Sequence, residues 1–244
     1  KNIIGKILKA LELEPSDSVL EIGSGKGDIT SLIAPCVGKL YAVEIDKRLL
    51  PELSDKVCGF SNVTIINNDI LKVDIESLLS NKDCKLKVFG NIPYYISSPI
   101  IEHLLNFRLA ISEIFIMLQK ELAERIAASP GSKEYSSFSC FVQYYALPEV
   151  LFHVKKGSFR PAPKIDSSLL YLKIRNTPLV YVKDEVEFFN FMRKAFSQRR
   201  KTLRNSLGDK FGKVEVAAIL ERKGLNINVR PEELSLQDFA DLFS

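Results

Sequence analysis

Four short apolar runs in the first 91 residues each end at a polar or glycine-rich segment. These runs are 18–22, 39–43, 63–66 and 86–89. Apolar residues at helical spacing precede the first run at 3–11, and helices are also predicted at about 28–34 and 49–57. Strands that alternate with helices and are apolar on both faces indicate an α/β fold, with a parallel sheet and helices on either side.

A residue with binding chemistry follows each of these four runs. Gly23 follows the first, Glu44 the second, Asp69 the third and Asn91 the fourth. In an open α/β sheet, ligands bind outside the carboxyl ends of the strands, where the strand order reverses. We therefore expect these four positions to meet in one site.

The rest of the chain is predicted to complete the sheet and then to become helical. Helices are expected at 99–106 and 120–128, strands at 111–118, 150–154 and 168–174, and mixed structure at 137–145. Two prolines exclude a helix or a central strand and predict a rigid loop at 159–166. Beyond the linker at 175–178 the pattern is helical to the end. We place a domain boundary near Asn176, which gives domains at 1–176 and 177–244.

Composition excludes several classes of protein. The 244 residues include four cysteines, none at metal-ligand spacing, and two isolated histidines, so no metal site is expected. Unpaired cysteines suit a reducing compartment, and we expect the cytoplasm. No apolar run approaches the length that spans a membrane, and the start of the chain does not resemble a signal peptide. The net charge of +4 is small, so the distribution of charge is more informative than its total.

The turn after the first strand separates two classes of cofactor. A glycine-rich turn from strand to helix lets a ligand approach the backbone closely. A dinucleotide fingerprint needs a third glycine where this sequence has Asp28, whose carboxylate would face a pyrophosphate poorly. Residues 21–27 (EIGSGKG) are instead similar to the first motif of S-adenosylmethionine-dependent methyltransferases. Glu44 is placed to take two ribose hydroxyls and Asp69 to accept from an adenine amine, so an adenosyl ligand is expected.

Residues 91–94 (NIPY) bring together an amide, a stiff backbone and an aromatic ring. Pro93 fixes its own φ and moves Ile92 out of the helical region. The loop can therefore present the Asn91 side chain and the Ile92 carbonyl as acceptors beside the Tyr94 ring. Two acceptors and a stacking face suit the exocyclic amine of a base. Alone, the stretch is more typical of a proline-containing turn, but its place after the fourth strand favours the binding interpretation.

Together these motifs resemble the ribosomal RNA adenine dimethyltransferase family. The resemblance is carried by residues 21–27 (EIGSGKG), 43–46 (VEID), 68–71 (NDIL), 91–94 (NIPY) and 159–168 (FRPAPKIDSS). It covers essentially the whole chain, and the last two motifs are the most specific. It implies an α/β, Rossmann-like S-adenosylmethionine-dependent methyltransferase fold with a small C-terminal all-helical domain for RNA recognition.

The resemblance also implies a role for each matching residue. The implied catalytic residues are Asn91, Ile92, Pro93, Tyr94 and Phe159, and the implied cofactor-binding residues are Glu21, Gly23, Gly25, Glu44, Ile45, Asp69, Ile70 and Asn91. Family members carry a segment with glutamine and phenylalanine ahead of the first helix, which helps to close over the cofactor. This sequence begins at Lys1, in what reads as the first turn of a helix, and that segment is absent from it.

Methyl transfer to adenine fits these residue types. The exocyclic amine is a poor nucleophile because its lone pair is delocalised into the ring. If Asn91 and Ile92 accept its N–H groups, the lone pair is more localised, and aiming it at the sulfonium methyl group is proximity catalysis. The target base must leave its stack, and the rings of Tyr94 and Phe159 are expected to hold it. The positive sulfur already activates the methyl group, so no metal is needed.

Two groups of cations are candidate contacts to RNA phosphates. Residues 193–213 hold eight lysines and arginines and one acid, Asp209. Such runs are usually solvated faces, but this excess in a nearly neutral chain favours phosphate binding, and we expect the cations to cluster on one helix opposite an apolar stripe. A second group surrounds Phe159. The predicted RNA-binding residues are Lys155, Lys156, Arg160, Lys164, Arg193, Arg199, Arg200, Lys201 and Arg204.

The function that the resemblance implies is dimethylation of two adjacent adenosines near the 3′ end of 16S ribosomal RNA, in an assembling small subunit. We expect a monomer. The nearest alternative is the macrolide-resistance type, which methylates one adenosine of 23S ribosomal RNA and shares the catalytic motifs. A non-catalytic RNA- or DNA-binding factor of methyltransferase descent is disfavoured by the intact motifs after the strands. A nicotinamide oxidoreductase is disfavoured by the glycine spacing.

Overall fold

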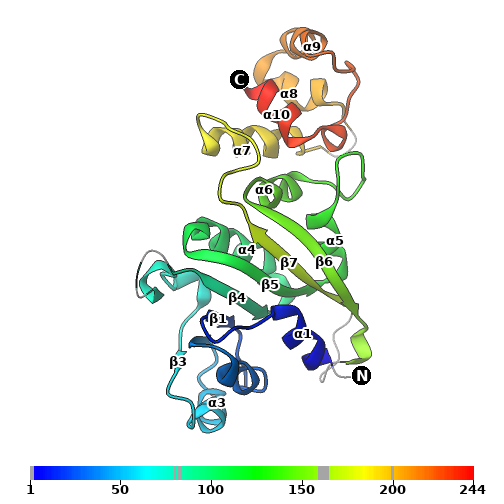
Figure 1. Ribbon diagram of the computed structural model, residues 1–244. Coiled ribbons are helices and arrows are strands. Elements are labelled where there is room, and N and C mark those ends of the chain that lie inside the picture. The colour runs from blue at the N-terminus through cyan, green and yellow to red at the C-terminus, as the bar shows by residue number, and fades with distance from the viewer. Residues whose placement is uncertain (1–2, 80, 82–83, 159–164, 199–200) are drawn as a thin grey trace. The chain divides into compact units, whose positions relative to one another are not determined.

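One seven-stranded sheet organises the α/β part of the chain (Figure 1). The computed structural model describes residues 3–79, 81, 84–158, 165–198 and 201–244. The strands are β1 (Ser18–Ile22), β2 (Lys39–Val43), β3 (Val63–Ile66), β4 (Leu86–Asn91), β5 (Ile111–Gln119), β6 (Ala146–Val154) and β7 (Ser167–Ile174). Their order in the sheet is β3-β2-β1-β4-β5-β7-β6, so the direction of winding reverses between β1 and β4. That reversal is where an open α/β sheet binds its ligand.

The strands from β1 to β5 pair in parallel, as the sequence predicts for the first four. Ile22 at the end of β1 lies between Val43 of β2 and Gly90 of β4. Asn91 is still part of β4 and pairs with Met117 of β5. The sequence left the direction of the last two strands open, and the structure shows that β7 runs antiparallel to β5.

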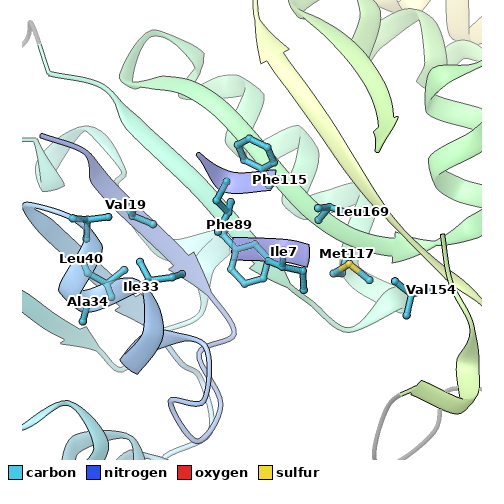
Figure 2. Close-up of a cluster of buried hydrophobic side chains, with 12 residues drawn as sticks. Ile7, Val19, Ile33, Ala34, Leu40, Phe89, Phe115, Met117, Val154 and Leu169 are labelled. Atoms are coloured by element: carbon cyan, nitrogen blue, oxygen red, sulfur yellow. The ribbon is translucent and has the colours of Figure 1, made fainter. Parts of the chain in front are cut away.

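A cluster of buried hydrophobic side chains covers one face of this sheet (Figure 2). Val19, Phe89 and Phe115 come from three neighbouring strands, β1, β4 and β5. Helices α1 (Ile3–Leu11) and α2 (Thr30–Ile33) add Ile7 and Ile33 to the same cluster. Full burial of a side chain of this size stabilises the fold by about 1.5–3 kcal/mol, so the cluster fixes α1 against the strands that carry the predicted site.

Side-chain caps set the start of several of the remaining helices. The remaining α-helices are α3 (Leu50–Val57), α4 (Ser97–Asn106), α5 (Lys120–Ala127), α6 (Ser137–Tyr145), α7 (Glu185–Ala195), α8 (Leu203–Phe211), α9 (Lys213–Arg222) and α10 (Leu236–Phe243), and side-chain caps are seen at α6, α7 and α10. A reciprocal capping box between Ser136 and Ser139 starts α6, so the segment left as mixed by the sequence is helical. Asp184 caps α7 with a single bond, in which its side chain accepts from the amide of Glu187. Among the described residues, no helix is long and apolar enough to cross a membrane.

The contacts divide the chain into two compact units. The first is Lys1–Ala123 with Leu147–Ile174, and the second is Glu124–Ala146 with Arg175–Ser244. The predicted domains, 1–176 and 177–244, differ from this division because residues 124–146 group with the C-terminal helices. Backbone hydrogen bonds explain the grouping: Arg175 N donates to Tyr145 O at 2.9 Å, and Gly131 N donates to Glu232 O at 2.7 Å. Such pairings join distant parts of the chain and leave no local sequence signal.

The basic segment of the second unit does not form one helix, contrary to the prediction. Helix α7 ends at Ala195, and α8 begins only after Thr202, which has an extended backbone with ψ of 156°. The apolar residues on either side still follow helical spacing, which is why the sequence suggested a continuous stripe. Arg193 and Arg204 therefore belong to different helices.

Candidate active site

The turn after β1 is built from glycines in a backbone conformation that other residues rarely adopt. Gly23, Gly25 and Gly27 have φ of +75°, +58° and +84°. The amide of Gly23 donates to Val43 O at 2.9 Å, which ties the turn to the end of β2. A Cβ atom on Gly23 would lie 3.2 Å from Asn91 O, so the turn also lies against the end of β4. A side chain at Gly23 would disturb both the backbone and this close approach.

Glu44 is the acidic residue at the end of β2, and its carboxylate faces the glycine turn. It is buried, and its Oε2 accepts a hydrogen bond of 2.8 Å from the amide of Gly25. Its Oε1 accepts one of 2.8 Å from the amide of Asp46. Each carboxylate oxygen has two lone pairs, so both can accept a further bond from a ligand hydroxyl. Next to it, Ile45 is 65% exposed, an unusual position for a large apolar side chain.

The predicted residues after β3 surround the same end of the sheet. Asn67 Nδ2 donates to Glu44 O at 2.8 Å, which joins the ends of β2 and β3. Asp69 uses Oδ1 to accept from the amide of Leu71 at 3.1 Å and is only partly buried. Ile70 is buried beneath it. The carboxylate of Asp69 keeps acceptor capacity for a ligand amine.

The segment after β4 alternates between exposed and buried side chains. Asn91 is exposed, Ile92 is buried and Pro93 is exposed, with φ of −60° and ψ of 135° at the proline. The buried Ile92 side chain anchors the loop in the core. The hydroxyl of Tyr94 hydrogen-bonds with Ser167 Oγ at the start of β7, which fixes the far end of the ring. Phe159 lies outside the described residues.

A cavity of about 320 Å³ lies at this end of the sheet. It brings together four predicted site residues, Glu21, Gly23, Gly25 and Asn91. Glu44, Ile45, Asp69 and Ile70 are not among the lining residues, although Glu44 bonds directly to the lining backbone of Gly25.

Sequence reasoning missed several residues that line this cavity. They are Ile3, Ile4, Ile7, Ser24, Lys26, Asp28, Ile29 and Met117. The first three lie on the apolar face of α1, and their helical spacing gave no sign that part of this face borders a cavity rather than the core. Met117 faces the site because it pairs with Asn91.

Glu21 is an unusual carboxyl group for the middle of a sheet. Burial raises its pKa to about 7, and the nearby hydroxyls of Thr30 and Ser24 oppose this rise only in part. Glu21 Oε2, Ser24 Oγ and Thr30 Oγ1 are nevertheless all buried without a hydrogen-bond partner among the described residues. Buried polar atoms normally have partners, so these three atoms indicate a place where a bound ligand completes the structure.

The predicted RNA contacts are only partly described. Lys155, Lys156, Arg193 and Lys201 are exposed, and Arg204 is half-buried. The predicted contacts Arg160, Lys164, Arg199 and Arg200 lie outside the described residues. Asp166 Oδ1 accepts from the backbone amide of Lys156 at 3.0 Å, and Lys156 is exposed. The described residues contain no group of three or more histidine, cysteine or acidic side chains that could hold a metal ion.

Comparison with known proteins shows which family this chain belongs to. The family model of ribosomal RNA adenine dimethylase matches residues 1–244. The chain belongs to the ribosomal RNA adenine dimethylase family. As a member of this family it is an S-adenosylmethionine-dependent methyltransferase that acts on adenines of ribosomal RNA, as the sequence predicted. The nicotinamide interpretation is thereby excluded.

Individual relatives agree with the family assignment. Proteins named ribosomal RNA small subunit methyltransferase A, from Streptococcus pneumoniae and Streptococcus sanguinis, are 43% identical over 99% of this chain and 86% of their own length. A dimethyladenosine transferase from Plasmodium falciparum has 28% identity and a TM-score of 0.84, covering 99% of this chain and 94% of that one. The 23S rRNA methyltransferase ErmE has 25% identity and a TM-score of 0.78, covering 100% and 97%. The Rossmann-like methyltransferase fold is therefore confirmed.

The residues of this dimethylase suit S-adenosylmethionine. That cofactor carries hydroxyls, an ammonium group, a carboxylate and an adenine. The site offers the Glu44 carboxylate, an open backbone at Gly25 where a Cβ would meet nothing within 4 Å, and the unpartnered polar atoms of Glu21 and Ser24. Acidic acceptors, open backbone and an apolar wall from α1 match the mixed chemistry of this ligand.

Proposed function

We propose that this dimethylase methylates the exocyclic amines of two adjacent adenosines near the 3′ end of small-subunit ribosomal RNA, twice on each base, during subunit assembly. The observation that carries the proposal is the meeting of the β1 turn with the end of β4. A Cβ on Gly23 would lie 3.2 Å from Asn91 O, and both residues line one cavity. A cofactor site and an acceptor site therefore share a wall. The 43% identity to small subunit methyltransferases A supports the choice of RNA.

The cofactor is held by the residues at the ends of the first three strands. Glu44 takes ribose hydroxyls, Asp69 takes the adenine amine, and Ile45 offers an exposed apolar surface to the adenine ring. Gly23 and Gly25 let the ligand approach the backbone. When bound, S-adenosylmethionine supplies a methyl group on a positively charged sulfur.

The amine of the target adenosine is oriented by the residues after β4. The Asn91 side-chain oxygen and the Ile92 carbonyl accept its N–H groups, two before the first transfer and one before the second, which favours a localised lone pair. After each transfer the amine loses one proton to water. Burial of the Ile92 side chain and the fixed φ of Pro93 keep these two acceptors in place without the substrate. Positioning of this kind lowers the barrier because the amine and the methyl group meet in a reactive geometry.

Aromatic rings hold the flipped base. Tyr94 stacks on one face of the adenine, and its hydroxyl bond to Ser167 keeps the ring from turning away. Phe159 is proposed for the other face. Stacking of a base on an aromatic side chain contributes about 1–3 kcal/mol.

RNA outside the pocket is bound by cations of both units. Lys155 and Lys156 are exposed just before the segment that contains Phe159, where phosphates next to the flipped base would lie. In the second unit, Arg193, Lys201 and Arg204 are the described cations proposed to bind RNA. We also propose that the protein acts as a monomer, and in the cytoplasm, where ribosomal subunits are assembled.

The test supplies labelled S-adenosylmethionine with small subunits that lack the modification, with large subunits and with both naked RNAs. Label in the small subunit, recovered as dimethyladenosine, is the expected result. Label only in naked 23S RNA would assign the chain to the resistance type. Retained RNA binding with no label in any substrate would point to a non-catalytic factor.

A further inference from the structure

The second unit contains a cavity of its own, of about 330 Å³. All the residues that line it belong to this unit, and they come from three separate parts of the chain. Segment 124–146 contributes Arg125, Lys133, Tyr135 and Phe138, and the end of α7 is followed by Phe196 and Gln198. The 3₁₀ turn Pro231–Glu233 closes the cavity with Glu232. None of these residues has a role in the methyl-transfer site.

Two polar groups at this cavity are unused by the protein. The guanidinium of Arg125 is exposed and has no hydrogen bond or ion pair among the described residues. The side-chain amide of Gln198 also has no partner among them. A planar guanidinium presents several donors that match phosphate oxygens, and an amide matches the edge of a base.

Aromatic rings form the apolar part of the cavity. Tyr135 is buried, with its ring edge-on to Phe196 at 6.2 Å between centroids. Phe138 is half-buried, and Phe141 packs against it almost in parallel, at an interplanar angle of 15°. A ring that is supported by a second ring and also borders a cavity is a firm surface for stacking.

We propose that this cavity binds one unstacked nucleotide of the ribosomal RNA, with its base against Phe138 and its phosphate at Arg125. The inference rests on the proposed function in so far as RNA is the substrate. Single-stranded RNA is recognised by stacking on aromatic rings combined with cations that follow the backbone. The carboxylate of Glu232, which lies 3.9 Å from Arg230 Nη1, keeps acceptor capacity for a base amine, a contact that a simple anion could not make.

The first test compares Arg125→Ala with Arg222→Ala, which removes another exposed arginine of the same unit, one that does not line the cavity. Arg125→Ala is expected to raise KM for small subunits about tenfold with kcat unchanged. The plot of log association constant for small subunits against log salt concentration should become less steep, its slope smaller in magnitude by about one. Arg222→Ala is expected to change neither quantity. Equal effects of the two variants would overturn the proposal.

The second test uses the absence of tryptophan from this chain. Phe138→Trp places a single fluorophore in the cavity, and Tyr181→Trp places one at a side chain of the same unit that is 86% exposed. We expect small subunits to quench the tryptophan fluorescence of Phe138→Trp saturably and to leave that of Tyr181→Trp unchanged. Adding Arg125→Ala to Phe138→Trp should weaken the quenching. Equal quenching in both variants, or none in Phe138→Trp, would overturn the proposal.

These outcomes separate the cavity from the methyl-transfer site. If the unaltered protein methylates small subunits while Arg125→Ala behaves like Arg222→Ala, the nucleotide site is wrong and the proposed function stands. If the unaltered protein transfers no label to small subunits, the proposed function itself fails.

Discussion

The ammonium group of Lys87 in β4 donates a hydrogen bond of 3.0 Å to the carbonyl oxygen of Leu11, at the carboxyl end of α1. It also donates to Glu12 O at 3.1 Å and to Asp17 Oδ2 at 3.0 Å, and it is only 8% exposed. The other end of α1 supplies Ile3, Ile4 and Ile7 to the cavity that we propose for the cofactor. A cation at a helix C-terminus satisfies carbonyls that have no partner within the helix. Lys87 thus fixes the helix that walls the cavity.

Replacing Lys87 is therefore expected to affect cofactor binding from a distance. Lys87→Met leaves two carbonyls and the partly buried carboxylates of Asp17 and Glu113 without their cation. This should lower the free energy of unfolding by about 3 kcal/mol, the low end for a broken buried ion pair, because both carboxylates are partly exposed. It should also weaken S-adenosylmethionine binding, measured by calorimetry well below the melting temperature. The control is Lys85→Met, at an exposed lysine just before the same strand. Unchanged cofactor affinity in Lys87→Met would limit this lysine to a role in stability.

Glu21 makes the stability of the protein depend on pH. Its pKa is raised from 4.5 to about 7, so the folded state keeps its proton while the unfolded state loses it. The resulting stabilisation is complete below pH 4.5 and is lost as pH rises toward 7, by about 3 kcal/mol in total. Glu21→Gln removes this loss. Urea unfolding should show the variant more stable than the parent at pH 8, with a smaller difference at pH 4.5. A constant difference across this range would contradict the assignment.

Gly25 is predicted to be needed for the ligand more than for the fold. Its φ of +58° strains any other residue by about 1–2 kcal/mol, but an added Cβ would meet nothing within 4 Å. Because Gly25 lines the cavity, that Cβ would take up open space at the cofactor site. Gly25→Ala should reduce S-adenosylmethionine affinity at least tenfold while the protein stays folded. Gly59→Ala, at a glycine with equal room away from the cavity, should leave the affinity unchanged.

How far the sequence predicts this site depends on whether the signal is local. The four strand ends and the glycine turn could be predicted because apolar runs and the residues directly after them lie together in the chain. The role of Lys87 could not, because a lysine in an apolar strand gives no sign of partners 70 or more residues earlier. The cavity wall from α1 and the grouping of residues 124–146 with the C-terminal helices were also missed. Both depend on pairings between distant segments.

The hydroxyl of Tyr94 and its ring should contribute separately to methyl transfer. Tyr94→Phe keeps the stacking face but leaves the buried Ser167 Oγ without its partner, which costs about 1–3 kcal/mol of stability and loosens the ring. We expect a moderate fall in methyl transfer at saturating cofactor. Ser167→Ala should cause a fall in transfer of similar size, because it removes the same bond. Tyr94→Ala should cause a larger one, since stacking is also lost. A Tyr94→Ala variant as active as Tyr94→Phe would exclude stacking.

The central claim is that Asn91 acts chiefly on the acceptor amine and that the cofactor is held mainly by other residues. The most direct measurement pairs S-adenosylmethionine affinity, by calorimetry, with single-turnover methyl transfer to unmodified small subunits in Asn91→Ala. Asn106→Ala, at an exposed asparagine ending α4, is the control. We predict cofactor affinity within about threefold of the parent protein, a change worth less than 1 kcal/mol. Transfer should be lost by a factor of at least about a hundred, a difference of roughly 3 kcal/mol in the barrier. Full transfer, or a parallel loss of cofactor binding, would contradict the claim.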